Sequence, residues 1–500
     1  MRAKCFATTD KWRRIMDYQS TRNPGLRASP VEAVLAGIAP DGGLYIAKGL
    51  ENLGFDWKSC LKKDAFAMAA MILGTLLPDY EDMDALVEKA YRGKFETDEL
   101  TPLVKVGDKY SLELYRGPTS AFKDVALSML PQLMTAGRRQ QQTAAETLIL
   151  TATSGDTGKA ALEGFHDVEG TRIIVFFPAD GVSAVQKAQM VTQEGKNVTV
   201  CGVRGNFDDC QSGVKAAFAA LGGCAAEHGV TLSSANSINI GRLAPQLVYY
   251  FLAYKQLLER GDIREGDKVD FVVPTGNFGD ILAGYYSKLL GLPVGRLICA
   301  SNANRVLTDF FESGVYDRRR PFVLTTSPSM DILISSNLER LLFLISDGDS
   351  DLVAQCMKAL SAEGRYEFPA ELMEKIRAHF AAGCCDEQRC AEQIAKLWKE
   401  EGYLADPHTA VAFAVAEDFE SENKVVVLST ASPYKFPAAV LSALDAAVEG
   451  DDFAAMDALH ALTAVPVPRN LADLREKETL HRDVIERDAL IDYVRSKIGE

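Results

Sequence analysis

The architecture of this chain follows from one segment, which reads Thr147-Leu148-Ile149-Leu150-Thr151-Ala152-Thr153-Ser154-Gly155-Asp156-Thr157-Gly158-Lys159. Its first five residues form a short apolar run that is typical of a strand buried on both faces. Small hydroxyl residues and glycines then indicate a turn, and an apolar helical pattern follows from Ala160. A strand, a turn and a helix in this order are the repeating unit of a doubly wound parallel sheet.

The same texture recurs along much of the chain. Further apolar runs bounded by turn residues lie at 110–115, 172–177, 197–200, 269–273, 296–300 and 424–429. Their alternation with helical segments predicts an α/β protein with parallel sheets. Residues 1–100 are expected to be mostly helical, 318–401 helical and charged without a clear strand, and the last fifty residues terminal helices.

Length and composition narrow the class of protein. The 500 residues suggest about three domains. The chain is 47 % hydrophobic and 25 % charged, which excludes a disordered or fibrous protein. The net charge of −15 argues against a nucleic-acid partner, because an acidic surface repels phosphate backbones.

Targeting and metal signals are absent from the sequence. No run of about 18 apolar residues occurs, so no membrane span is expected. Met1 to Asp10 lack the apolar core of a secretory signal, which favours a cytoplasmic protein. The ten cysteines are scattered and the six histidines isolated, so we expect reduced thiols and no metal site.

Ligands of open parallel sheets bind beyond the carboxyl ends of the strands, so we expect the functional residues in the turns that follow the strands. The first is Gly117-Pro118-Thr119-Ser120-Ala121-Phe122-Lys123-Asp124. A helix start carries partial positive charge, which would lower the pKa of Lys123 and make it a better Schiff-base nucleophile. The alternative is a solvated lysine on a loop. Pro131 is expected to break or kink the following helix.

Two glycine-containing turns could each cradle an anion at a helix start. One is 153–158, where Thr153, Ser154 and Thr157 add hydroxyl donors; it fails the Walker pattern, and a plain helix cap is the alternative. The other is Pro274-Thr275-Gly276-Asn277-Phe278-Gly279-Asp280, where Asp280 is expected to cap the helix. A nicotinamide-type Gly-x-Gly-x-x-Gly motif is absent from the sequence.

Two further residues complete the set. Thr430 directly follows the apolar run 424–429. Its hydroxyl could face a heterocyclic ring nitrogen, although the residue could also belong to an ordinary turn. Arg242 could bind a phosphate or carboxylate through two nitrogens, the alternative being a surface arginine. A lysine, two anion cradles, a hydroxyl and an arginine fit a phosphorylated cofactor held through the lysine beside a second anionic ligand. Pyridoxal phosphate meets these demands.

The chain resembles the threonine synthase family, within the fold type II pyridoxal-phosphate enzymes, over nearly its whole length. The resemblance rests on residues 20–23, 32–45, 117–124, 153–158, 234–239, 276–280 and 406–410. Gly37-Ile38-Ala39-Pro40-Asp41-Gly42-Gly43-Leu44-Tyr45 and Ser237-Ile238-Asn239 are specific to the family.

The resemblance implies two doubly wound parallel-sheet domains, a mostly helical N-terminal domain and a helical insertion. The implied division is 1–100 for the N-terminal domain, 101–122, 260–317 and 402–500 for the large cofactor domain, 123–259 for the smaller domain and 318–401 for the insertion. A monomer or homodimer is expected.

The resemblance also implies roles for individual residues. Lys123 matches the catalytic lysine that carries the cofactor. The matching cofactor-binding residues are Gly276, Asn277, Phe278, Gly279, Asp280 and Thr430. Those matching the substrate site are Thr153, Ser154, Gly155, Asp156 and Thr157 for the carboxylate, with Asn239 and Arg242 for the phosphate. Arg116 departs from the family, which often has histidine there; it could replace that histidine only if the histidine positions phosphate.

The implied reaction converts O-phospho-L-homoserine and water into L-threonine and phosphate by γ-elimination and β-hydration, the last step of threonine biosynthesis. Three alternatives stay open: a phospho-lyase that yields 2-oxobutyrate, a dehydratase acting on threonine or serine, and a non-catalytic metabolite-binding relative. Met330 and Asp331 could reach the site, although a buried structural turn is the expected role.

Overall fold

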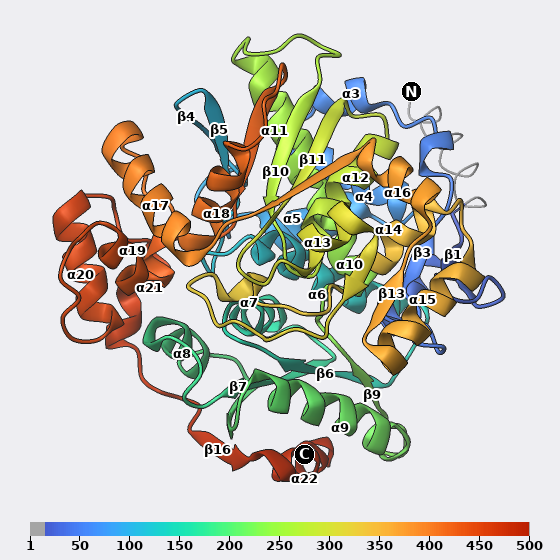
Figure 1. Cartoon of the computed structure of the whole chain (residues 1–500). Helices are drawn as coiled ribbons and strands as arrows, with labels where there is room; N and C mark the ends of the chain where they lie inside the picture. The colour runs from blue at the N-terminus through green and yellow to red at the C-terminus, as the bar shows by residue number, and fades with distance from the viewer. Residues whose placement is uncertain (1–15, 500) are drawn as a thin grey trace, which may run out of the picture.

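The structure, a computed structural model, describes residues 16–499 (Figure 1). The segment from Met1 to Asp10, expected to carry no secretory signal, lies outside the described residues. No described helix combines the length and the apolar character that a bilayer crossing needs.

The larger sheet has six strands in the order β14-β11-β10-β15-β5-β4. Neighbouring strands are parallel except for the β4–β5 pair, which is antiparallel. Their bounds are Leu103–Val106 (β4), Lys109–Glu113 (β5), Val269–Pro274 (β10), Val294–Ser301 (β11), Phe380–Cys384 (β14) and Lys424–Ser429 (β15). Every residue of β10 is buried, as the apolar run predicts. Its alternate side chains enter two different apolar clusters, so both faces of this sheet are covered.

Helices from distant parts of the chain cover the larger sheet. On one side, α18 (Pro407–Ala416) is buried along its whole length and packs on β10, β11 and β15. The apolar residues of α12 (Gly279–Leu289) and α11 (Leu247–Glu259) belong to the other cluster. Because β10 leads directly into α12, the turn between them lies at the carboxyl edge of the sheet.

The smaller sheet has five parallel strands in the order β16-β8-β7-β6-β9. They are Glu146–Ala152 (β6), Thr171–Pro178 (β7), Val198–Arg204 (β8), Val230–Ser233 (β9) and Asp483–Glu486 (β16), with helices α7 (Asp156–Phe165), α8 (Ala184–Val191), α9 (Phe207–Glu227) and α22 (Leu490–Ile498). The expectation that the last fifty residues form only helices is wrong, since β16 pairs with β8 and α22 packs on α9 (Figure 1).

The N-terminal domain contains the expected helices α2 (Pro30–Ala36), α3 (Trp57–Leu61), α4 (Ala65–Leu76) and α5 (Met83–Tyr91). It also contains a small antiparallel sheet of β1 (Tyr18–Ser20), β2 (Arg27–Ala28) and β3 (Tyr45–Ala47). Strands of two or three residues show no readable periodicity, which is why the sequence missed them.

Helix α6 spans Lys123–Gln140 and continues through Pro131, so the predicted break is wrong. Proline removes the N–H that would bond to the carbonyl of Leu127 four residues earlier. That carbonyl lies against Gly164 of α7, where an added Cβ would come within 1.9 Å of its oxygen. Close packing of the two helices therefore holds α6 together around the proline.

The segment 318–401 is not purely helical, which corrects the predicted insertion. It contains α14 (Leu338–Ile345), α15 (Ser350–Glu363), α16 (Ala370–Arg377) and α17 (Glu387–Glu401). However, β13 (Arg365–Glu367) pairs with β12 (Val315–Asp317), and β14 forms an edge of the larger sheet. Strand β14 belongs to the larger sheet, so part of the segment 318–401 lies in the large domain. Strand β16 belongs to the smaller sheet, so part of the segment 402–500 lies in the small domain. The other predicted domain boundaries stay predictions.

Candidate active site

The start of α6 is fixed to the end of β15. The backbone N–H of Phe122 donates to the Thr430 carbonyl at 2.8 Å, and Ala121 pairs with Ala431 in an isolated antiparallel bridge. Lys123 and Thr430 are 307 residues apart in the sequence. These contacts bring them together at the carboxyl edge of the larger sheet.

Lys123 is buried, with 8 % of its side chain exposed. Its Nζ lies 3.8 Å from Oδ2 of Asp156 and donates to Ser329 Oγ at 3.3 Å. Burial lowers the pKa of Lys123 to about 8; the Asp156 carboxylate opposes this shift, and the charges of Lys435 and Arg242 reinforce it. The predicted lowering of the pKa is confirmed, but its main cause is desolvation rather than the helix terminus.

We call residues 153–157 the Asp156 loop. The Thr153 hydroxyl accepts hydrogen bonds from the N–H groups of Gly155 and Gly158 at 3.0 and 2.9 Å, so it shapes the turn. Gly155 has φ 138°, and a Cβ there would meet the Gln186 amide at 2.3 Å. Asp156 is the first residue of α7. Ser154, which precedes the N-cap Gly155, and Thr157, in the first turn, are half-buried.

The Asp156 carboxylate collects donors from several elements. Its Oδ1 lies 2.6 Å from Nζ of Lys435 and accepts from Nε2 of Gln186 at 3.0 Å. Burial would raise the pKa of Asp156, but the charges of Lys435 and Lys123 outweigh it and hold that pKa below its ordinary value. Sequence reasoning missed Lys435 and Gln186, because nothing local marks either as buried.

We call residues 276–280 the Gly276 loop; it connects β10 to α12. A Cβ at Gly276 would lie 2.5 Å from the Ser329 carbonyl oxygen, so the loop passes close to that backbone. Phe278 adopts a left-handed conformation with φ 64°, and its buried ring stacks on Phe311. Asn277 is exposed, and its carbonyl accepts from the Asn337 N–H at 3.0 Å.

Asp280 is not the N-cap of α12, contrary to prediction. The cap position is Phe278, and no side chain bonds to the helix start in the N-cap manner. Asp280 instead accepts from the N–H of Ile281 at 2.8 Å, and burial raises its pKa to about 7. With Gly276 and Gly279 beside it, this helix start presents backbone donors without a competing N-cap side chain, which suits an anion.

Asn239 is the N-cap of α10 (Ile240–Leu243), and Arg242 lies within this short helix. The Asn239 side chain caps this helix through Gly241 N–H at 2.9 Å and donates to the Val34 carbonyl at 2.9 Å, so its polar atoms serve the fold. Arg242 is buried, which rules out the surface alternative. Its Nη1 donates to the Ala235 carbonyl at 2.8 Å, while its buried Nε has no hydrogen-bond partner among the described residues. Burial lowers the pKa of Arg242 to about 10.

A turn of the segment 318–401 also reaches the site, which the sequence only hinted at. Ser329 contacts Lys123, and its N–H donates to Nε2 of His408 at 3.1 Å. The other ring nitrogen of His408 lies 2.6 Å from Oδ2 of Asp406, which fixes the ring. Asp331 accepts from Asn302 at 2.8 Å and from other neighbours, so the expected structural role is confirmed for it.

Arg116 stands apart from this group. Its guanidinium bonds to Glu113 at 2.6 Å and to Glu96 at 2.9 Å. Both carboxylates neutralise the arginine, so it is not positioned as a spare phosphate ligand.

The residues fit a phosphorylated aldehyde cofactor. A buried amine with a lowered pKa is available to form a Schiff base, and the start of α12 offers backbone N–H groups to a phosphate. The Nε of Arg242 has no hydrogen-bond partner among the described residues, so it can donate to a second anion. The Thr430 hydroxyl, at the end of β15, is a neutral group suited to a ring nitrogen.

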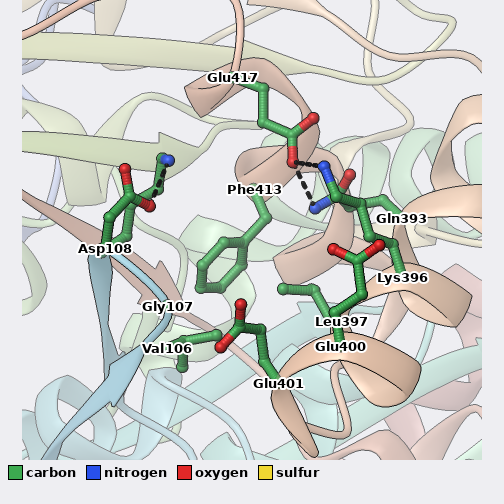
Figure 2. Close-up of a pocket in the computed structure, with 11 residues that line it drawn as sticks. Val106, Gly107, Asp108, Gln393, Lys396, Leu397, Glu400, Glu401, Phe413 and Glu417 are labelled. Atoms are coloured by element: carbon green, nitrogen blue, oxygen red, sulfur yellow. Dashed lines mark hydrogen bonds and ion pairs between the residues drawn. The ribbon is translucent and has the colours of Figure 1, made fainter.

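A surface pocket of about 320 Å³ lies elsewhere, between the β4–β5 turn and helices α17 and α18 (Figure 2). Its lining carries Asp108, Glu400, Glu401 and Glu417 but only two lysines. Glu417 accepts from Lys396 at 2.8 Å (Figure 2). The excess of carboxylates makes this pocket a poor site for an anionic substrate.

Comparison with known proteins decides the family. Residues 100–431 match the family described as pyridoxal-phosphate-dependent enzymes. Residues 17–91 match the threonine synthase N terminus, and residues 409–494 match the threonine synthase C-terminal domain. This chain belongs to the threonine synthase family. The predicted fold type II architecture and the pyridoxal-phosphate family are thereby confirmed.

Similar proteins from several organisms support this family assignment. The crystal structure of PLP-bound threonine synthase from Brucella melitensis is similar with a TM-score of 0.85 at 37 % identity, covering 97 % of this chain and 100 % of that chain. Threonine synthase of Saccharomyces cerevisiae is 36 % identical over 469 residues, which cover 85 % of this chain and 89 % of that protein. Threonine synthase-like 1 of Macaca fascicularis is 40 % identical over 430 residues; the match covers 83 % of this chain but 58 % of that longer protein.

Proposed function

We propose that this protein is a threonine synthase, which converts O-phospho-L-homoserine and water into L-threonine and phosphate with pyridoxal phosphate as cofactor. The observation that carries the proposal is the buried Lys123 amine, which lies beside Asp156 and Ser329, the residue whose carbonyl oxygen lies against Gly276. Two observations support a phosphorylated substrate. The chain belongs to the threonine synthase family, and the buried Nε of Arg242 has no hydrogen-bond partner among the described residues.

Cofactor binding is assigned to the carboxyl edge of the larger sheet. Lys123 would hold the aldehyde carbon. Backbone N–H groups of Gly276, Asn277, Phe278 and Gly279 would surround the phosphate at the start of α12, with Asp280 completing the turn. Thr430 would face the pyridine nitrogen, and a neutral hydroxyl there leaves that nitrogen unprotonated.

Substrate binding is assigned to two groups of donors. The Asp156 loop, from Thr153 to Thr157, would bind the substrate carboxylate through the half-buried hydroxyls and N–H groups at the start of α7. Arg242 would bind the substrate phosphate. Asn239 contributes indirectly, because it caps the helix that carries Arg242.

Bound pyridoxal phosphate supplies an electron sink for the charge left at Cα of the substrate. Lys123 takes the α-proton, which it can do as a neutral amine because its pKa is about 8. Lys123 or a neighbour then moves a proton from Cβ, and the Cγ–O bond breaks with its electron pair leaving on phosphate. A proton would first return to Cγ, which places the double bond between Cα and Cβ and makes Cβ open to attack. Hydroxide from water would then add at Cβ while the remaining proton of that water goes to phosphate, and a proton returned to Cα would give L-threonine.

A product assay tests the proposal. Purified protein loaded with pyridoxal phosphate is mixed with O-phospho-L-homoserine, and phosphate, threonine and 2-oxobutyrate are measured together. Equal amounts of phosphate and threonine are expected. Phosphate with 2-oxobutyrate would show a phospho-lyase, turnover of threonine or serine would show a dehydratase, and binding without products would show a non-catalytic relative. The cytoplasmic location and the monomer-or-homodimer state remain predictions.

A further inference from the structure

A second lysine is buried at the site, and the roles assigned above leave it without a function. Lys435 ends the short 3-10 helix Pro433–Lys435, which follows β15, and none of its surface is exposed. Its Nζ lies 2.6 Å from Oδ1 of Asp156 and donates to the Thr119 carbonyl at 3.2 Å. A fully buried lysine is costly unless it is paired, so this contact is specific.

Asp156 stands between two amines. One carboxylate oxygen faces Lys435 and Gln186, and the other lies 3.8 Å from Nζ of Lys123. The three charged groups come from three elements: the start of α6, the start of α7 and the turn after β15. The shorter of the two lysine–carboxylate distances belongs to Lys435, so this lysine is the tighter partner.

The other charged groups near the two amines are few. The charge of Arg242 on α10 lowers the pKa of Lys123, and the charge of Asp280 on α12 raises it. The charge of Lys435 also acts to lower the pKa of Asp124 on α6. The Asp124 carboxylate, however, accepts hydrogen bonds from the hydroxyl and the N–H of Thr119, at 2.5 and 2.9 Å. With Lys435 absent, Lys123 would be the one cation paired with Asp156 among residues 16–499, and a buried lysine–carboxylate pair favours the charged form of both groups.

We propose that Lys435 is a positioning residue that takes Asp156 as its own ion-pair partner and so keeps the nitrogen of Lys123 free to lose its proton. This inference rests on the proposed function of Lys123 as the group that carries the cofactor and moves the α-proton. It explains why a base is placed beside a carboxylate that would otherwise hold it protonated.

The test is a pH titration of the visible absorbance of the cofactor-loaded protein, which reports protonation of the Lys123 nitrogen and requires no substrate. Lys435→Met is expected to raise the apparent pKa by about one unit or more, since it removes a like charge and frees Asp156. Lys435→Gln keeps a hydrogen-bond donor without charge and is expected to shift in the same direction. Asp156→Asn is expected to lower the apparent pKa.

The double variant Lys435→Met with Asp156→Asn removes both members of the pair, so its pKa is expected to lie closer to that of the unchanged protein than either single variant does. Lys159→Met is the matched control. Lys159 lies on α7 with Asp156 and is half-buried, but it pairs with Glu163 at 3.0 Å rather than with Asp156, so no shift is expected. Circular dichroism verifies that each variant is folded.

Two results would overturn the inference. One is an unchanged or lowered apparent pKa in Lys435→Met that is nevertheless folded and loaded with cofactor. The other is a rise of KM for O-phospho-L-homoserine at constant kcat with an unshifted titration, which would make Lys435 a substrate ligand. Failure to form threonine would instead contradict the proposed function and leave the absorbance titration interpretable.

Discussion

Replacing Gly276 with alanine tests how tightly the Gly276 loop is held in the site. The added Cβ would lie 2.5 Å from the Ser329 carbonyl oxygen, about 1 Å closer than an ordinary contact of about 3.5 Å. Both segments are backbone at this point, so the methyl group cannot be relieved by a rotamer change. Either the loop or the turn Pro328–Met330 must move.

The cost can be worked out from two opposing effects. Overpacking of this kind costs about 1–3 kcal/mol. Replacing glycine restricts the unfolded chain, which returns about 0.4–1 kcal/mol. Gly276→Ala is therefore expected to lower the free energy of unfolding by about 1.3 kcal/mol, the difference between the midpoints of the two ranges, and by at most about 2.6 kcal/mol. It should also weaken cofactor binding, because the displaced loop is the proposed phosphate site.

Gly279→Ala is the matched control. It lies three residues along, at the first position of α12, and its added Cβ would be 3.4 Å from the Asn337 amide, an ordinary contact. Its helix propensity should leave the protein unchanged or more stable by up to about 1 kcal/mol. Urea unfolding followed by circular dichroism measures both variants. If Gly276→Ala proves as stable as Gly279→Ala and binds the cofactor as tightly as the unchanged protein, Gly276 does not approach the Ser329 carbonyl so closely.

Three further predictions concern charge in the site. Arg242→Met should raise KM for O-phospho-L-homoserine at least about tenfold while the protein still binds the cofactor, since a charged hydrogen bond is worth about 1.5–3 kcal/mol. Steady-state kinetics that show no change in KM would contradict a place for Arg242 in the phosphate site. The rate of α-proton exchange should rise with pH through about 8, where Lys123 becomes neutral, and a profile that falls over this range would contradict its role as base. Because the pKa of Asp280 is raised from 3.8 to about 7, the folded state holds a proton that the unfolded state has lost. The wild type should therefore lose stability relative to Asp280→Asn as pH rises from about 4 to about 7, by up to about 4 kcal/mol; urea unfolding at several pH values that shows a constant difference would refute this.

Much of the fold could be predicted from apolar runs. Strand β10, with Val-Asp-Phe-Val-Val-Pro, is buried throughout and carries the signal that a central parallel strand should. Strand β14 was missed because Phe-Ala-Ala-Gly-Cys has no β-branched residue and lies at a sheet edge. Strand β16 was missed because three of its four residues are exposed, so pairing with β8 rather than burial makes it a strand.

The site divides in the same way. Lys123, the Asp156 loop and the Gly276 loop were predictable because each follows a strand, and strand ends of a doubly wound fold converge. Lys435 follows Thr430 by five residues, yet a lone lysine gives no sign that it is buried. Ser329 is brought to Lys123 by the packing of a segment about 200 residues away, which no local pattern encodes.

The most direct test of the account is to find the lysine that carries the cofactor. The protein loaded with pyridoxal phosphate is reduced with borohydride, digested and mapped by mass spectrometry. A pyridoxyl group is expected on the peptide that contains Lys123, with Lys435 and Lys159 unmodified. A pyridoxyl group on Lys435 with none on Lys123, or on neither in a protein that has bound the cofactor, would contradict this expectation.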